Sequence, residues 1–188
     1  MSGAKLSPAS RVMAAQYRVF DRLRDPRAFA AAREEGTAPD FEGFRGARQA
    51  LVVTFKRSGE PVPTPVNFGL SDDGKLYFRC EPHVAKIRRL TNDPHVRLSP
   101  CNLRGKPLGP MVEARAHVLP ELENERCHAI VMANWRFDTK LSEGIYDRIG
   151  VPEIYVEVTP QPNVPTQSHV DAVPRPNHSM RRPNSAGR

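Results

Sequence analysis

The sequence lacks the features that mark several protein classes. Its 188 residues contain no run of about 18 apolar residues, so we expect no membrane-spanning helix. The first 20 residues have no continuous apolar segment with a cleavage site, so we expect no secretory signal. The three cysteines, Cys80, Cys101 and Cys127, are widely spaced. An odd number of scattered cysteines indicates reduced thiols in a cytoplasmic protein rather than a disulfide framework.

Motifs for common cofactors and metals are also missing. Gly105 and Gly109 stand apart as turn residues, and without a glycine-rich fingerprint a Rossmann-type nicotinamide site is not expected. Cys80, His83 and Cys101 could in principle bind zinc, but they lack the second close pair of a structural metal site. We therefore predict no metal site. No general acid or base stands out, so the catalytic residues are unknown.

The charge of the chain is unevenly distributed. The net charge is +7, of which residues 1–40 carry +2, residues 41–159 carry +2 and residues 160–188 carry +3. A DNA-binding domain usually concentrates its positive charge on its folded part. The nearly balanced central segment argues against nucleic acid as a partner, although the basic tail leaves polyanion binding as an alternative.

Composition divides the chain into three parts. Residues 1–40 are predicted to be an N-terminal helical extension, in which a helix from Ser7 is interrupted at Asp25-Pro26 and a second helix spans Arg27–Glu35. Residues 41–160 are predicted to form one β-rich domain. Residues 161–188 are rich in proline, asparagine and serine without hydrophobic periodicity, which predicts a disordered tail.

The central part alternates β-branched and aromatic residues in short runs separated by polar turns. The predicted strands are Gln49–Lys56, Val62–Leu70, Lys75–Cys80, His95–Cys101, Met111–Leu119 and Ile154–Val158. Helices are predicted over Val84–Leu90, Glu121–Trp135 and Leu141–Ile149. Short antiparallel strands with helices between them predict a mainly β fold, a closed or nearly closed barrel with helices at its rims. The three prolines between residues 61 and 65 place part of the second strand at an edge or bulge.

Two stretches, GEPVPTPVNFGL and GKLYFRCEPHVAKIRRLTNDPHVRLSPCNLRGKPLGP, resemble the split β-barrel flavin and deazaflavin reductases, the relatives of pyridoxamine 5′-phosphate oxidase. The similarity is greatest to the branch described as dependent on coenzyme F420, and it covers roughly residues 44–159. It implies an FMN-binding-like split barrel, a homodimer with cofactor sites at the interface, and hydride transfer between the cofactor and a small organic substrate. Coenzyme F420 is the first candidate cofactor, with FMN or FAD as the alternative.

A basic helix after the third strand is the candidate phosphate site. A phosphate binds to Lys or Arg side chains, backbone N–H groups and helix N-termini. In the family, a basic residue at the position resembling Lys86 holds the phosphate. His83 and Arg89 lie three residues on either side of Lys86, and Arg79 leaves the preceding strand toward the same region. An ordinary solvated helix face is the alternative interpretation of these charges.

The flat ring of such a cofactor needs an apolar wall and a few hydrogen bonds to its polar edge. The candidates on the second strand are Val62, Thr64, Pro65 and Asn67, where the prolines could equally protect an edge against aggregation. Weaker candidates at the end of the fourth strand are Ser99 and Asn102. His83, Tyr77 and solvent are possible proton donors. Arg104–Pro110 or Trp135 could complete the pocket from a second subunit.

A non-enzymatic role in the same barrel is a different class of function. The barrel could store a cofactor or bind haem or another tetrapyrrole, with His83, His95 and His117 as possible axial ligands. A lone histidine is more often structural than a ligand, so we place this alternative behind the oxidoreductase.

Overall fold

The computed structural model describes residues 23–134 and 152–161. The helix predicted from Ser7, the helix predicted over Leu141–Ile149, Trp135 and the tail beyond residue 161 lie outside these described residues. The remaining predictions can be compared with the fold directly.

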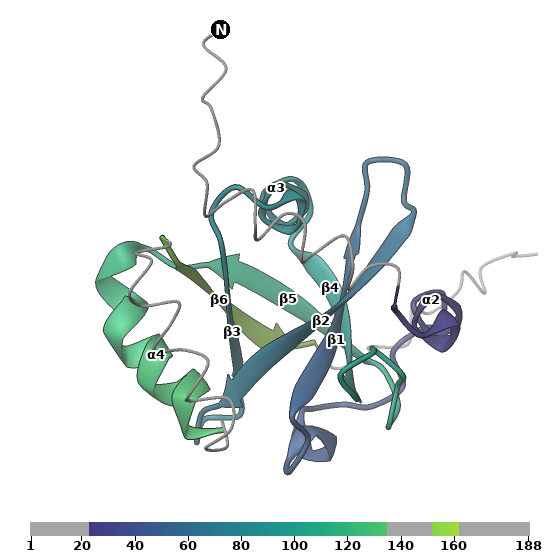
Figure 1. Ribbon diagram of the computed structural model, residues 1–188, viewed down its shortest axis with the longest axis horizontal. Helices are drawn as coiled ribbons and strands as arrows, with labels where there is room; N and C mark the ends of the chain where they lie inside the picture. The colour runs from purple at the N-terminus through teal and green to yellow at the C-terminus, as the bar shows by residue number, and fades with distance from the viewer. Residues whose placement is uncertain (1–22, 135–151, 162–188) are drawn as a thin grey trace, which may run out of the picture.

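The described residues form a closed antiparallel barrel with the strand order β1-β2-β3-β6-β5-β4 (Figure 1). Its strands are β1 (Gln49–Phe55), β2 (Pro61–Leu70), β3 (Leu76–Cys80), β4 (His95–Cys101), β5 (Val112–Val118) and β6 (Ile154–Pro160). The predicted split β-barrel is thereby confirmed. Each of the six predicted strands is present, with ends that differ from the prediction by at most two residues.

The core lies inside the barrel and follows the two-residue period of the strands. Since successive side chains of a strand point to opposite faces, one alternate set from each strand meets in the interior. This interior set consists of Ala50, Val52, Val66, Phe68, Leu76, Phe78, Val96, Leu98, Val112, Ala114, Ala116, Val156 and Val158. The other set faces outward and contacts the helices.

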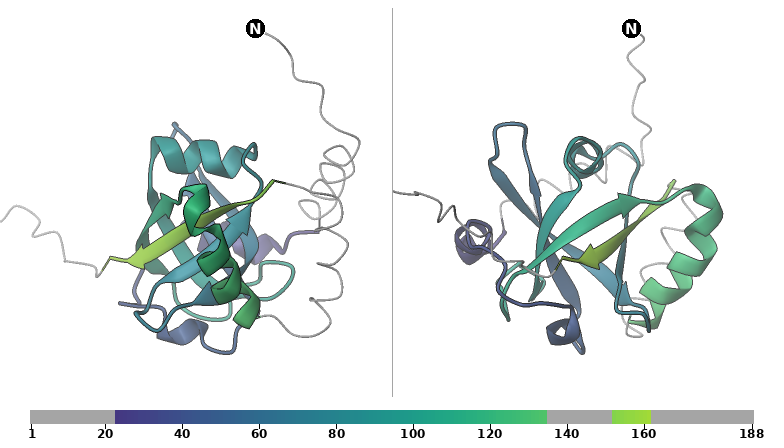
Figure 2. Two further views of the ribbon diagram at one scale, coloured as in Figure 1. Left: turned by 90° about the vertical axis from the view of Figure 1, so that its left-hand side faces the viewer. Right: turned by 180° about the vertical axis from the view of Figure 1, so that it is seen from behind.

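Each end of the barrel is closed by a different element. Phe41 precedes the 3-10 helix η1 (Glu42–Phe44) and Phe44 is its last residue; both join the core at the end where β1 begins. At the opposite end, α3 (Ala85–Asn92) connects β3 to β4 and contributes Leu90 to the core. In Figures 1 and 2, α3 lies across this end of the barrel in every view.

A short helix, α2 (Pro26–Ala31), covers the outer face of β1 and β4. Asp25 caps it by accepting a hydrogen bond from Arg27 N at 2.9 Å, and Pro26 occupies its first turn. Its alanines pack against outward-facing residues of the two strands. The helix ends four residues earlier than the predicted Glu35.

No helix among the described residues is long and apolar enough to span a membrane.

A longer helix, α4 (Asn124–Ala133), covers the outer face of β3 and β6 after the 3-10 helix η2 (Glu121–Glu123). Cys127 and Val131 of α4 pack against Tyr77 and Tyr155 of the two strands. The helix also lies against the backbone of β2 at Gly69, where a side chain would overlap the carbonyl of Ile130.

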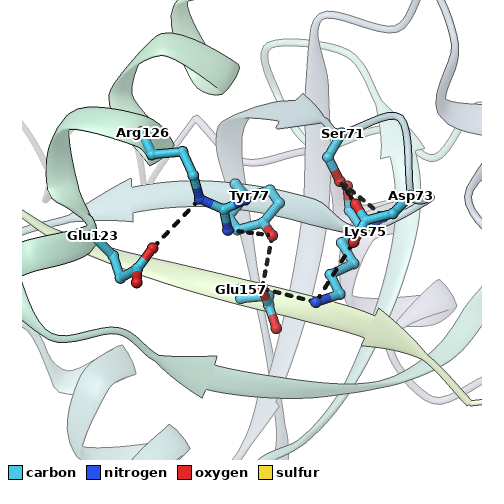
Figure 3. A network of polar contacts seen from close by, with 7 residues as sticks. All are labelled: Ser71, Asp73, Lys75, Tyr77, Glu123, Arg126 and Glu157. Carbon is cyan, nitrogen blue, oxygen red and sulfur yellow. Dashed lines mark hydrogen bonds and ion pairs between the residues drawn. The ribbon is translucent and has the colours of Figure 1, made fainter.

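Polar contacts around Tyr77 hold the same helix in place. Figure 3 shows the Tyr77 hydroxyl between Glu157 of β6, to which it donates at 2.7 Å, and Arg126 of α4, which donates to it at 3.2 Å. Lys75 forms an ion pair with Glu157 at 3.2 Å. Burial raises the pKa of Tyr77 and the bond to the Glu157 carboxylate raises it further, so the phenol stays protonated. Tyr77 lies beneath α4, so its hydroxyl links this helix to β6.

Replacement of Gly69 tests the contact between α4 and β2. We expect Gly69→Ala to lower the free energy of unfolding by about 2 kcal/mol, because the new methyl group forces α4 away from the strand. Gly43→Ala is the matched control, since a Cβ at Gly43 meets nothing within 4 Å. Urea denaturation of both variants measures the difference. A Gly69→Ala protein as stable as the Gly43→Ala protein would contradict the close approach.

Candidate functional site

The barrel opens between β2 and β3 at the end covered by α3. β2 pairs with β1 from Pro61 to Asn67, but its pairing with β3 covers only Phe68 to Leu70. The first half of β2 therefore has β1 on one side and no strand on the other, and the last residues of β3, Arg79 and Cys80, pair only with β6. We refer to this end, bounded by α3, the first half of β2 and the end of β3, as the split end.

Prolines determine where the split lies. Pro61, Pro63 and Pro65 have no N–H, so only the alternate residues Val62 and Thr64 can donate from this stretch. Val62 and Thr64 pair with β1, and the N–H groups of alternate residues in a strand point to the same side. Both N–H groups are therefore used in the hydrogen bonds to β1. The side that faces the split therefore offers carbonyl groups and no donor between residues 61 and 65. The predicted edge character of this strand is confirmed, and a further strand cannot add there.

Helix α3 places Lys86 at the split end with its side chain buried. Residues four apart share a helix face, so Lys86 lies on the face that Leu90 inserts into the core. The exposed fractions are 8% for Lys86 and 3% for Leu90. The Lys86 ammonium lies 5.2 Å from the centre of the Phe78 ring of β3. Arg88, on the opposite face, is exposed.

The charge of Lys86 is not compensated within the described part of the chain. No carboxylate of the described residues forms an ion pair with it, whereas Lys56 pairs with Glu60 and Lys75 pairs with Glu157. The pKa of Lys86 is lowered to about 8, chiefly by burial; Cys80 opposes this effect, and the nearby charges of Arg89 and Arg24 make smaller contributions that lower it. A buried cation of this kind is costly unless an anion accompanies it.

Arg89 adds a second positive charge to the split end. Its Nε donates at 2.7 Å to the hydroxyl of Thr54, a fully buried residue at the end of β1. Burial lowers the pKa of Arg89, and the neighbouring charges of Arg88 and Arg24 act in the same direction. α3 thus carries one cation toward β3 and one toward β1, across the region where β2 and β3 part.

The N-terminus of α3 is the third positive feature. Val84 precedes the helix in an extended conformation, no side chain caps the first turn and the first turn has no acidic residue. The first N–H groups of a helix lack intrahelical acceptors and carry the positive end of the helix dipole. Together with Lys86, they form an arrangement that suits a phosphate group.

The remaining residues predicted for phosphate binding lie elsewhere. Phe78 faces the interior, so Arg79 faces outward, where its guanidinium forms an ion pair with Glu153 at 2.8 Å. The structure therefore places Arg79 on the opposite face of β3 from Lys86, not on the same spot. His83 is exposed in the turn before α3, near the helix N-terminus.

The predicted ring-binding residues of β2 divide between the two faces of the strand. Val62 and Thr64 alternate with Val66 along β2, so their side chains face the barrel interior as that of Val66 does. Both are half-buried at the split end. Pro65 and Asn67 have outward parity. The side-chain oxygen Oδ1 of Asn67 accepts a hydrogen bond from Gln49 Nε2 at 3.1 Å, at the far end of β1. Of the four, the structure brings Val62 and Thr64 to the region of Lys86.

Ser99 and Asn102 have structural roles. The Ser99 hydroxyl is fully buried and donates to the carbonyl of Gly109 at 2.8 Å. The Asn102 side chain accepts hydrogen bonds from Arg104 N and Lys106 N at 2.9 and 3.0 Å, and so stabilises a turn. Both lie at the end of β4 that is remote from α3.

The loop from Arg104 to Pro110 packs within its own chain. Arg104 donates through Nε to the carbonyl of Leu23 at 3.0 Å, and its own carbonyl accepts from Asp25 N.

Cys101 packs under α2 while Cys80 contacts the barrel interior. No cluster of three metal-binding side chains is present in residues 23–134 and 152–161.

Sequence reasoning missed Thr54, Phe78 and Arg24 as parts of the split end. Thr54 and Phe78 were assigned only to strands, and Arg24 lies at the end of a predicted helix. The alternation of strand side chains could have indicated that Phe78 and Thr54 face inward. No sequence signal connects Arg24 with Lys86, which is 62 positions away.

Comparison with known proteins gives a general likeness of fold. The sequence matches no protein-family model and no curated protein. Similar solved structures include a conserved hypothetical protein of Mycobacterium tuberculosis, with 14% identity over 68% of this chain and 86% of that chain and a TM-score of 0.49. A protein of Listeria innocua named as a candidate pyridoxamine 5′-phosphate oxidase has 14% identity over 63% and 87%, with a TM-score of 0.43.

A structure named F420 reductase has 14% identity over 66% of this chain and 95% of that chain, with a TM-score of 0.44. With TM-scores below 0.5 throughout, the assignment of the fold rests on the strand order of the chain itself. That order, with a short helix between β3 and β4, is the split barrel.

Replacement of Lys86 tests the cost of its buried charge. We expect Lys86→Met to raise the free energy of unfolding at pH 7 by about 1–3 kcal/mol, because methionine keeps the apolar stem and removes the charge. A folded-state pKa of about 8 against the ordinary 10.5 sets an upper limit of roughly 3 kcal/mol. Arg88→Met is the matched control, since it removes an exposed charge from the same helix.

The gain in the free energy of unfolding from Lys86→Met should become smaller as the pH rises above 8. Below pH 8, Lys86 is protonated in the folded and unfolded chain and its full cost is present. Between pH 8 and 10.5 the unfolded chain still binds the proton while the folded chain releases it, so the cost declines. Denaturation at pH 7 and pH 9.5 should therefore show a smaller difference between wild type and Lys86→Met at the higher pH. An unchanged or larger difference would contradict a lowered pKa.

Proposed function

We propose that the protein is an oxidoreductase that binds a flavin or deazaflavin cofactor at the split end and transfers hydride between that cofactor and a small organic substrate. Coenzyme F420 is the first candidate cofactor, and FMN or FAD is the alternative. The observation that carries the proposal is the position of Lys86, a buried cation without a described counter-ion at the open end of an antiparallel barrel. The sequence resemblance to split-barrel reductases supports the same function.

The residues at the split end fit such a cofactor. A phosphate would compensate the charge of Lys86, with Arg89 and the N–H groups at the start of α3 as further donors. Val62 and Thr64 would contact the ring, beside the carbonyl groups of the open edge of β2. Those carbonyl groups accept hydrogen bonds, which suits an N–H group on the polar edge of a ring. The cofactor itself would supply the hydride chemistry.

The chain's own contribution would be binding, orientation and electrostatics. Lys86 and Arg89 would fix the anionic part of the cofactor, and the apolar barrel end would exclude water from one side of it. No side chain of the described residues is assigned as a proton donor. Tyr77, one of the candidates, donates its hydroxyl proton to Glu157 beneath α4.

The resemblance also suggests a homodimer in the cytoplasm, with cofactor sites shared between subunits. The free thiols of Cys80, Cys101 and Cys127 support the cytoplasmic part of this proposal. We expect sedimentation equilibrium at micromolar concentration to give twice the mass of the chain. A monomer mass with and without cofactor would contradict the dimer.

Absorbance titration tests the cofactor. Purified protein is mixed separately with coenzyme F420, FMN and FAD, whose rings absorb at different wavelengths, and binding is read from the change in the ring spectrum. We expect one of the three to bind, and Lys86→Met to weaken that binding about 10- to 100-fold, the 1.5–3 kcal/mol of a charged hydrogen bond. Reduced cofactor is then offered with a panel of small substrates.

Arg88→Met again serves as the control, because Arg88 lies on the same helix but points away from the split end. Its affinity should equal that of the wild type. If Lys86→Met binds the cofactor as tightly as Arg88→Met, the phosphate lies elsewhere. If none of the three cofactors binds, the proposed function is wrong.

A further inference from the structure

The amine of Lys86 is chemically different from that of Lys56 and Lys75. Those two side chains end in ion pairs with carboxylates, at 2.7 and 3.2 Å. Lys86 has no carboxylate partner among the described residues, is nine-tenths buried and has positive neighbours. These conditions favour the neutral amine, which is a nucleophile.

The fraction of Lys86 that is neutral is large at neutral pH. With a pKa of about 8, about a fifth of Lys86 is neutral at pH 7.4, against roughly one in a thousand for an ordinary lysine. Lys86 lies beside the gap between β2 and β3, so a small molecule that enters this gap would meet its amine. Arg89 and the uncapped start of α3 would attract an anionic group on that molecule.

We propose that Lys86 is a carbonyl-reactive lysine: its buried amine at the split end, which has no carboxylate partner among the described residues, forms a reversible Schiff base with small aldehydes that carry a phosphate group. The nitrogen lone pair attacks the carbonyl carbon to form a C–N bond. Two protons pass from the nitrogen to the carbonyl oxygen, the C–O bond breaks as this oxygen leaves as water, and a C=N bond replaces the C=O bond. No oxidant or reductant is needed. The reaction shares the site of the proposed function but does not depend on it.

The test uses glyceraldehyde 3-phosphate as the probe and glyceraldehyde, which lacks the phosphate, as its matched control. The full chain is incubated with each aldehyde at pH 7.4 and quenched with borohydride, which reduces the imine to a stable amine. Peptide mass spectrometry then gives the initial labelling rate of every lysine. We expect Lys86 to be labelled at least tenfold faster than Lys56 by the phosphate-bearing aldehyde, and more slowly by glyceraldehyde.

The pH profile provides an independent readout. Between pH 7.4 and 9, the neutral fraction of an amine with a pKa of about 8 rises about fivefold, whereas that of an ordinary lysine rises about 40-fold. Labelling of Lys86 should follow the shallower of these two slopes. Inorganic phosphate should protect Lys86 but not Lys56, and Lys86→Arg should abolish the fast-labelled peptide.

Labelling of Lys86 no faster than Lys56 would overturn the proposal, and equal rates with the two aldehydes would overturn its selectivity for phosphate. The outcomes separate this proposal from the proposed function. Fast labelling that coenzyme F420, FMN and FAD all fail to block supports the reactive lysine and contradicts a cofactor phosphate on Lys86. Slow labelling in a protein whose cofactor binding requires Lys86 supports the cofactor site and overturns the reactive lysine.

Discussion

The contact of Leu90 with the barrel core fixes the chemistry of the split end. Leu90 closes the end of the barrel where β3 passes into α3, and its burial sets the rotation of the helix about its axis. Lys86 lies one turn earlier on the same face, so the ammonium is carried beneath the helix with the leucine. Arg88, two residues further along, is directed to solvent by the same rotation. One apolar contact therefore determines which of the helix cations is buried.

The prolines of β2 complement this constraint. A strand without N–H groups on one side cannot pair there, so β2 and β3 separate after three residue pairs and leave a gap in the barrel wall beside α3. The hydrophobic core is unaffected, because Val66, Phe68 and the inward residues of the other strands still meet inside. The opening and the buried cation coincide because α3 must connect β3 to β4 at the same end.

The strands could be predicted from the sequence because their side chains have a two-residue period, and the positions of turns are marked by glycine, proline and aspartate. The pairing of strands could not, since it depends on contacts between distant segments. The face of Arg79 was nevertheless predictable. It follows Phe78, a large apolar residue of a strand with one buried face, and alternation directs it outward.

The candidate site was predictable to a smaller extent. The resemblance proposed Lys86 as a candidate, but its burial and the lack of a carboxylate partner among the described residues depend on the packing of Leu90 and on which carboxylates lie nearby. Ser99 and Asn102 were chosen for their polarity at the end of β4. Both are occupied by hydrogen bonds to backbone groups of the following loop. An asparagine followed closely by Gly105 is typical of such a turn, and this signal favoured the structural role.

The energetics of Lys86 argue for an anionic ligand independently of the family. Folded domains are stable by about 5–15 kcal/mol, so a buried charge that costs up to roughly 3 kcal/mol removes a substantial part of that margin. Methionine would fill the same space without the cost, and the ring of Phe78 would contact it equally well. An anion at the split end would reverse the effect: it would raise the pKa of Lys86 and stabilise the folded chain by the free energy of binding. The charge that costs the barrel stability would therefore become favourable if the proposed phosphate bound beside it.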